Sequence, residues 1–423
     1  MRKFSRLFLG VVAAFLILGN APRFIPIVAT YGNANVGELA LYVAAIVYLA
    51  VSTLTRGLSL RPTLVYIFLA ATLASLIVGI FKWEIESEPL IYNVRFTMQL
   101  LTAIAIGQAM ACWYGSDVAR VVRELVWMYL LISAMALALF LIFPESTALW
   151  AALAEFGIEF QGDPHIGRLV SFYFDPNYFG TIIVLPILLL TLFGRSNYVD
   201  LMKAGFLLLC LALTTSRSGI STLILCGVYV AALKVVEVGR RQAVPRYLLS
   251  GVPVVLVGLA SLAVVFQDYV VRITERFTAV GSDESASYRL ESFRVGNQLI
   301  GEEPLLGFGY NYGLQAVLKH RSLGLDSSLQ TVVLNYGMVL SALMFVGLAL
   351  WARARYLTLN KSGSALRPLW EFVFVYFAIC MLWSGNFNQL LFYPFWVVPV
   401  FGLFAYIDVQ MGRERLTGAR SAS

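Results

Sequence analysis

Long apolar runs recur along the whole chain, and they constrain its fold more than any other feature. Of its 423 residues, 59% are hydrophobic and 13% are charged, against about 25% charged residues in a soluble domain. A helix that crosses a bilayer needs about 20 mostly apolar residues, and the runs predict an all-α polytopic membrane protein with about 12 transmembrane helices. The runs occupy residues 7–25, 37–54, 63–81, 94–113, 124–143, 177–194, 199–215, 219–236, 248–266, 328–351, 369–385 and 388–408.

Charge tests these helices independently, because short cytoplasmic loops collect Lys and Arg. With a cytoplasmic N-terminus and alternating segments, the cytoplasmic side holds 20 of the 31 basic residues and seven of the 24 acidic ones. Both termini are therefore predicted to be cytoplasmic. The basic residues are scattered over short loops, so nothing indicates nucleic-acid binding. The four cysteines lie in apolar runs and there are only two histidines, so no metal site is predicted.

Two segments on the predicted outer side are long, at about 144–176 and 267–327. Loops of that length in a compact protein are usually functional or disordered. The first of these loops lies among the first transmembrane helices, and the second divides the chain into three parts. Residues 1–266 carry the first transmembrane helices, residues 267–327 form a large outer loop, and residues 328–423 carry the last helices and a cytoplasmic tail.

The large outer loop contains a pattern typical of a helix. Ser282-Asp283-Glu284-Ser285 resembles a helix start, since short oxygen-bearing side chains cap free amides there. The residues that follow form one helical stripe, which consists of Leu290, Phe293, Asn297 and Ile300. The pattern predicts a short amphipathic helix near 284–301 on the outer surface.

Basic residues are rare on the predicted outer side, so each one needs a reason. Arg217 lies between two short apolar runs, which places it near the outer interface. An ionisable residue at that depth is a functional candidate, although an arginine can also extend to lipid headgroups. Arg289 has no obvious partner on the predicted amphipathic helix, whereas Arg294 can pair with Glu291 three residues earlier.

Two further candidates stand beside helix starts. Arg168 shortly precedes Asp175-Pro176-Asn177, and Asp326 precedes the long run that begins at residue 328. Capping is the structural alternative for Asp175, Asn177 and Asp326. Arginine suits a diphosphate because its planar, always charged guanidinium carries several donors. Several arginines together with a carboxylate predict a lipid-linked phosphate substrate.

The order of these motifs resembles the O-antigen ligase and polymerase superfamily of bacterial polysaccharide assembly. The matching residues, over about 165–340, are Arg168, Asp175-Pro176-Asn177, Ser216-Arg217, Arg289, Pro304-Leu305-Leu306-Gly307-Phe308-Gly309, and Asp326 followed by Gly337. The resemblance implies a GT-C-like glycosyltransferase that needs no metal or cofactor. Its substrate would be a glycan on undecaprenyl diphosphate, at the periplasmic face of the bacterial inner membrane. The diphosphate-binding arginines would be Arg217 and Arg289, with Arg168 as a third.

One departure from the ligase pattern favours a polymerase. Ligases of this superfamily typically carry His-Asn where this chain has Asp326-Ser327. An acidic residue there looks more like the polymerases, which join a lipid-linked chain to a new lipid-linked repeat unit. Asp326 is the first choice for the group that accepts the acceptor's proton, and His320 is the second. Tyr288, Tyr310 and Tyr312 are candidates for stacking on sugar rings, or for anchoring at the interface.

Two alternatives stay open. A ligase would transfer the glycan to lipid A core or another acceptor. A transporter or flippase would fit the number of helices, but no internal repeat is visible and the charges gather on the outer side. Expected partners are the bilayer, the lipid-linked glycan and other polysaccharide-assembly proteins such as a flippase or a chain-length regulator.

Overall fold

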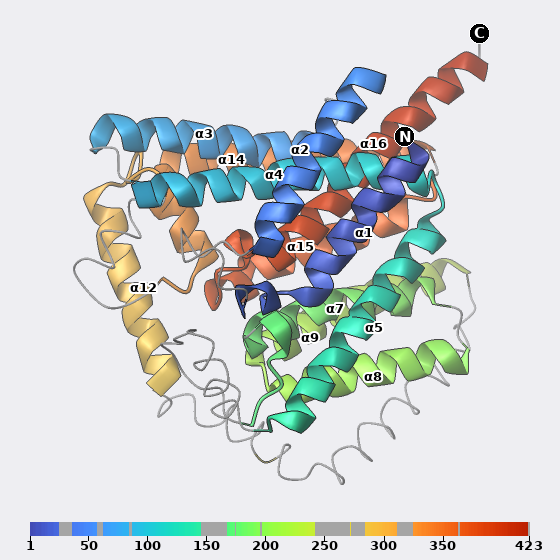
Figure 1. Cartoon of the computed structure of the whole chain (residues 1–423), viewed down its shortest axis with the longest axis horizontal. Helices are drawn as coiled ribbons and strands as arrows, with labels where there is room; N and C mark the ends of the chain where they lie inside the picture. Colours follow the sequence, from blue (N-terminus) through green and yellow to red (C-terminus); the bar gives the residue numbers. More distant parts are fainter. Residues whose placement is uncertain are drawn as a thin grey trace. The chain divides into compact units, whose positions relative to one another are not determined.

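Figure 1 shows a computed structural model of the chain. It describes residues 1–24, 36–56, 62–83, 87–144, 167–173, 175–194, 197–241, 271, 284–310, 325–362 and 364–421. Every regular element within these ranges is helical, and eight of the helices are long and apolar enough to cross a membrane. The protein is therefore an all-helical polytopic membrane protein, as the apolar runs predict.

A helix occupies each predicted apolar run except 248–266, which lies outside the described residues. These helices are α1 (Arg2–Leu18), α2 (Val36–Arg56), α3 (Thr63–Lys82), α4 (Ser87–Trp113), α5 (Val118–Ile142), α7 (Pro176–Phe193), α8 (Tyr198–Thr214), α9 (Arg217–Arg241), α14 (Ser328–Ser362), α15 (Arg367–Leu382) and α16 (Pro394–Ser421). α1 and α8 have 17 residues each, slightly less than a full membrane span, whereas α9 has 25.

The chain divides into two compact units. The larger comprises Met1–Val121 and Tyr288–Ser423, and the smaller comprises Val122–Ser287. Parts of both long predicted loops lie outside the described residues, so the predicted division at these loops remains a prediction.

α4 and α16 form the centre of the larger unit, with α1, α2 and α3 packed around them and α14 beside α3 (Figure 1). α16 is buried along almost its whole apolar length. Its Asp408 is buried, pairs with Arg355 of α14 at 2.6 Å and accepts a hydrogen bond from the Thr63 backbone N–H at 3.0 Å. One carboxylate thus joins three helices and neutralises a helix N-terminus, which explains an acidic residue in an apolar segment.

α14 is broken at Gly337, whose backbone (φ 68°, ψ 172°) is not helical. The Pro304–Gly309 segment supplies backbone partners at the break. Leu334 accepts from the Phe308 N–H at 2.8 Å, and Pro304 accepts from the Met338 N–H at 2.8 Å. Backbone groups freed by a break must find partners where water is absent. The Pro304–Gly309 segment, the glycine-rich motif, therefore has a structural role, because it supplies the hydrogen-bond partners at the break in α14.

In the smaller unit α7 packs against both α8 and α9. A Cβ atom on Gly219 of α9 would lie 2.7 Å from the carbonyl carbon of Gly180 of α7, so the two backbones are in direct contact. Helices in membranes associate closely where small residues face each other.

The predicted amphipathic helix is present as α12 (Glu284–Glu302), and it packs a different face against the protein from the one that carries Leu290 and Phe293. Leu290 and Phe293 are exposed, while Ser292, Val295 and Gly296 are buried. The reason is close packing on α14. A Cβ atom at Gly296 would lie 3.0 Å from the side chain of Gln330, so small residues, rather than the most apolar ones, form the contact.

Candidate functional site

Arg289 and Asp326 form an ion pair in the larger unit. The Arg289 Nε atom lies 3.7 Å from an Asp326 carboxylate oxygen, and the side chains are 25% and 37% exposed. This distance is too long for a hydrogen bond, and Arg289 Nε has no hydrogen-bond partner among the described residues. By contrast, Arg95 of α4 binds Glu38 of α2 bidentately at 2.7 and 2.6 Å. The Arg289–Asp326 pair is therefore the looser of the two.

The start of α14 fixes this pair. The Ser327 hydroxyl accepts a hydrogen bond from the Gln330 N–H at 3.2 Å, so a cap of α14 comes from Ser327, next to Asp326. The Gln330 side chain donates to the Phe293 carbonyl at 2.8 Å and to Asn297 Oδ1 at 2.9 Å, both on α12. These bonds join the helix that carries Arg289 to the helix start that carries Asp326.

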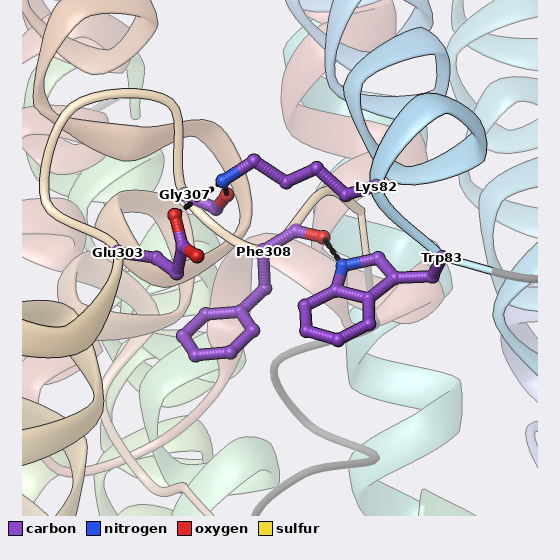
Figure 2. Close-up of polar contacts among 5 residues, drawn as sticks. All are labelled: Lys82, Trp83, Glu303, Gly307 and Phe308. Carbon is purple, nitrogen blue, oxygen red and sulfur yellow. Dashed lines mark hydrogen bonds and ion pairs between the residues drawn. The ribbon is translucent and has the colours of Figure 1, made fainter.

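The glycine-rich motif is held by the end of α3 (Figure 2). The Lys82 ammonium group pairs with the Glu303 carboxylate and donates to the Gly307 carbonyl at 2.9 Å. The Trp83 indole N–H donates to the Phe308 carbonyl at 2.8 Å, and the two rings are parallel within 8° with centroids 5.9 Å apart. Phe308 also packs with Val295 of α12 and, beside Asp326, with Leu325.

Arg168 is buried in the smaller unit and binds two other segments. Its Nε donates to the Thr214 carbonyl at the end of α8 at 2.9 Å, and its Nη2 donates to Asn177 Oδ1 at 2.8 Å. Asp175 caps α7 by accepting from the Asn177 and Tyr178 N–H groups at 2.6 and 3.1 Å. The capping interpretation is confirmed for Asp175, whereas the Asn177 side chain orients Arg168.

Arg217 is the first residue of α9 and is half-buried. Ser216 caps this helix, because its hydroxyl accepts from the Gly219 N–H at 3.1 Å. A cation on the first turn is unfavourable next to the positive end of the helix dipole, unless an anion binds there. The positive end of the helix dipole and the guanidinium make this helix start suitable for an anion.

The structure thus brings the predicted site residues together in two groups, one in each compact unit. In the smaller unit, Arg168 binds the Thr214 carbonyl at the end of α8, and Arg217 begins α9 shortly after it. In the larger unit, Arg289 and Asp326 lie together. A single site made of all four residues remains a prediction, because each unit is described by itself.

The aromatic candidates have different outcomes. His320, Tyr312 and the side chain of Tyr288 lie outside the described residues. Tyr310 is buried among other rings, stacked on Phe96 with centroids 5.9 Å apart. Its burial holds the pKa of the hydroxyl well above its usual range. This packing favours a structural role for Tyr310, and its sugar-binding role remains a prediction.

Sequence reasoning missed Lys82, Trp83 and Glu303. A basic residue and a tryptophan at the end of an apolar run are typical of residues that anchor a helix at the membrane interface. No local sequence signal therefore indicated that these residues contact the glycine-rich motif. A partner more than 200 positions away gives them their contacts with the motif.

Residues 202–345 match a family model described as O-antigen ligase. The matched region contains Arg217, Arg289 and Asp326, together with the glycine-rich motif. None of the curated proteins matches the chain.

Proposed function

We propose that the chain is a surface polysaccharide polymerase, and the match of residues 202–345 to a family model described as O-antigen ligase supports this proposal. It acts as a glycosyltransferase at the periplasmic face of the bacterial inner membrane, with both termini in the cytoplasm. It joins repeat units carried on undecaprenyl diphosphate.

In the proposed reaction, a hydroxyl of the acceptor sugar attacks the anomeric carbon of the donor glycan. The new glycosidic bond forms as the bond to the lipid diphosphate breaks, and the bonding electrons leave with the diphosphate. The hydroxyl proton passes to the Asp326 carboxylate. Arg217 and Arg289 stabilise the negative charge that grows on the leaving group, which is often the largest single catalytic effect.

The observation that carries this proposal is the loose ion pair of Arg289 and Asp326. A cation suited to the leaving group lies 3.7 Å from a carboxylate suited to the acceptor hydroxyl, and both side chains are partly exposed. Glycosyl transfer needs both functions at one reacting centre. The pair also lies inside the matched region.

A ligase is the second candidate, because the matching family model is described as O-antigen ligase. Asp326 and Ser327 stand where ligases typically carry His-Asn, which favours the polymerase. The surface glycan of a deletion strain separates the two. Loss of a polymerase leaves a single repeat unit on the lipid A core, whereas loss of a ligase leaves none.

Arg289→Ala tests the catalytic assignment. We expect chain extension to fall about a hundredfold, because one preorganised contact to the developing charge is lost. Arg294→Ala is the matched control, since Arg294 lies on the same helix, is exposed and pairs with Glu291 at 2.9 Å. Chain lengths are measured from surface polysaccharide, with the protein quantified in the membrane. Wild-type chain lengths in Arg289→Ala would remove this residue from the mechanism.

Arg217→Ala is the corresponding test in the smaller unit. We expect a similar loss of extension while the protein still accumulates, because α9 keeps its Ser216 cap. A variant that extends chains normally would show that the α9 start does not hold the diphosphate.

A further inference from the structure

Trp83 is an exposed aromatic ring whose orientation is fixed by the protein. The ring is 41% exposed. Its only polar atom is already satisfied by the Phe308 carbonyl, and its plane is set by the parallel Phe308 ring (Figure 2). A ligand that stacks on this ring does not have to immobilise a free side chain, so it avoids that entropy cost.

We propose that Trp83 is a platform on which a sugar ring of the glycan substrate stacks. The inference rests on the proposed function and names a binding subsite for its substrate. An aromatic face carries partial negative charge, whereas the C–H groups of a pyranose ring carry partial positive charge. The two surfaces therefore attract each other while burying apolar area.

Charged groups beside the ring complete the subsite. Lys82 and Glu303 pair with each other and remain 25% and 38% exposed at their side chains. An ammonium group donates to sugar hydroxyls and a carboxylate accepts from them. An apolar face with a few polar groups at its edge is the usual composition of a small-molecule site.

The direction of the indole N–H argues against simple anchoring in lipid headgroups. A tryptophan in an interfacial belt is amphipathic and usually directs its N–H to the wet side. The Trp83 N–H instead points to the backbone carbonyl of Phe308. The exposed side chain therefore has no polar atom left to bind a headgroup.

One packed side chain connects the platform to the proposed reacting groups. Phe308 stacks on Trp83 and packs with Leu325, the residue before Asp326. In the predicted topology, the end of α3 and the start of α14 both face the periplasm, where the glycan lies.

The test measures binding of lipid-free oligosaccharide, released from the host's own surface polysaccharide, to the full-length protein in lipid nanodiscs. We expect Trp83→Ala to weaken binding about threefold to tenfold, the loss expected for one aromatic stacking contact. Trp83→Phe keeps a stacking ring and should bind within about twofold of wild type. Thermal unfolding of each variant checks that the fold is kept.

Trp383→Ala is the matched control, because Trp383 is 44% exposed and also follows the last residue of a helix. It should bind like wild type. Equal weakening in Trp383→Ala, unchanged binding in Trp83→Ala, or no binding to the wild-type protein would each overturn the platform. Failure of the proposed function is seen separately, as a deletion strain whose polysaccharide is unchanged.

Discussion

The carboxylate of Asp326 lies beside a cation and directly before a capped helix start. Ser327 supplies a cap for α14, and Arg289 faces Asp326 at 3.7 Å. Both side chains are partly exposed, so a ligand that carries phosphate and hydroxyl groups can approach them. At the scale of single residues, this arrangement makes Asp326 the first choice for the proton acceptor.

Asp326→Asn tests this assignment, because the amide keeps the size of the side chain and loses the charge that accepts a proton. We expect chain extension to fall about a hundredfold or more, the usual contribution of a general base. Extension is measured from polysaccharide length at equal protein level. Glu291→Gln removes an exposed carboxylate from the same region and should have no effect. Normal extension in Asp326→Asn would assign the proton to another group.

Arg168 provides the corresponding test of stability. Its guanidinium is buried and joins the end of α8 to Asn177. Arg168→Ala should lower the free energy of unfolding by about 2–3 kcal/mol, since hydrogen bonds from charged groups are lost and their acceptors stay buried. Thermal unfolding in detergent measures this loss. Arg168→Lys should restore only part of it, because lysine cannot form the same fork. An unchanged unfolding temperature in Arg168→Ala would contradict the buried linking role.

At the scale of elements, the broken helix α14 and the inserted motif depend on each other. Gly307 and Gly309 have φ values of 69° and 89°, which favour glycine. Gly309 is packed so closely on Gly79 of α3 that a Cβ atom would overlap its backbone. The same segment positions Phe308 between Trp83 and Leu325. The close contact between Gly309 and α3 therefore holds the segment that carries Phe308 against the end of α3.

Gly309→Ala should destabilise the protein by about 2 kcal/mol or more, through backbone strain and steric overlap. Gly301→Ala is the control, since a Cβ atom there meets no other atom within 4 Å. The measurement is the amount of protein in the membrane together with its unfolding temperature. Equal stability of the two variants would show that the contact between Gly309 and α3 is not needed.

At the scale of the whole molecule, the distribution of basic residues predicts the membrane orientation. Eight described helices are long and apolar enough to span, and α1 and α8, with 17 residues each, are slightly shorter apolar helices. A short helix can still cross where the bilayer thins or neighbouring helices cover its ends. The excess of Lys and Arg in alternate loops predicts that both termini are in the cytoplasm.

Single cysteines test this orientation. Cys112→Ser gives the background, because the other three native cysteines are buried. A cysteine at exposed Leu305 should react with a membrane-impermeant maleimide in spheroplasts, whereas one at Lys361 should react only after permeabilisation. Labelling in the opposite order would invert the topology and place the proposed site in the cytoplasm.

The sequence alone determined the helical membrane architecture, because a bilayer selects for local properties that are visible in a single run of residues. Apolar length, loop charge and the Asp175 cap are all of this kind. The order of short motifs also indicated the family, since each motif is local even where its partners are not.

Only the tertiary structure decided which side chains are buried, paired or exposed. Tyr310 was a candidate for sugar stacking, but it is buried. No sequence signal distinguished Trp83 from a residue that anchors a helix at the membrane interface, yet it is exposed and its orientation is fixed by a hydrogen bond. α12 packs closely on α14 at Gly296, where a Cβ atom would lie 3.0 Å from the Gln330 side chain, and it leaves Leu290 exposed. These outcomes depend on contacts between residues far apart in the chain, and no periodicity within one segment carries that information.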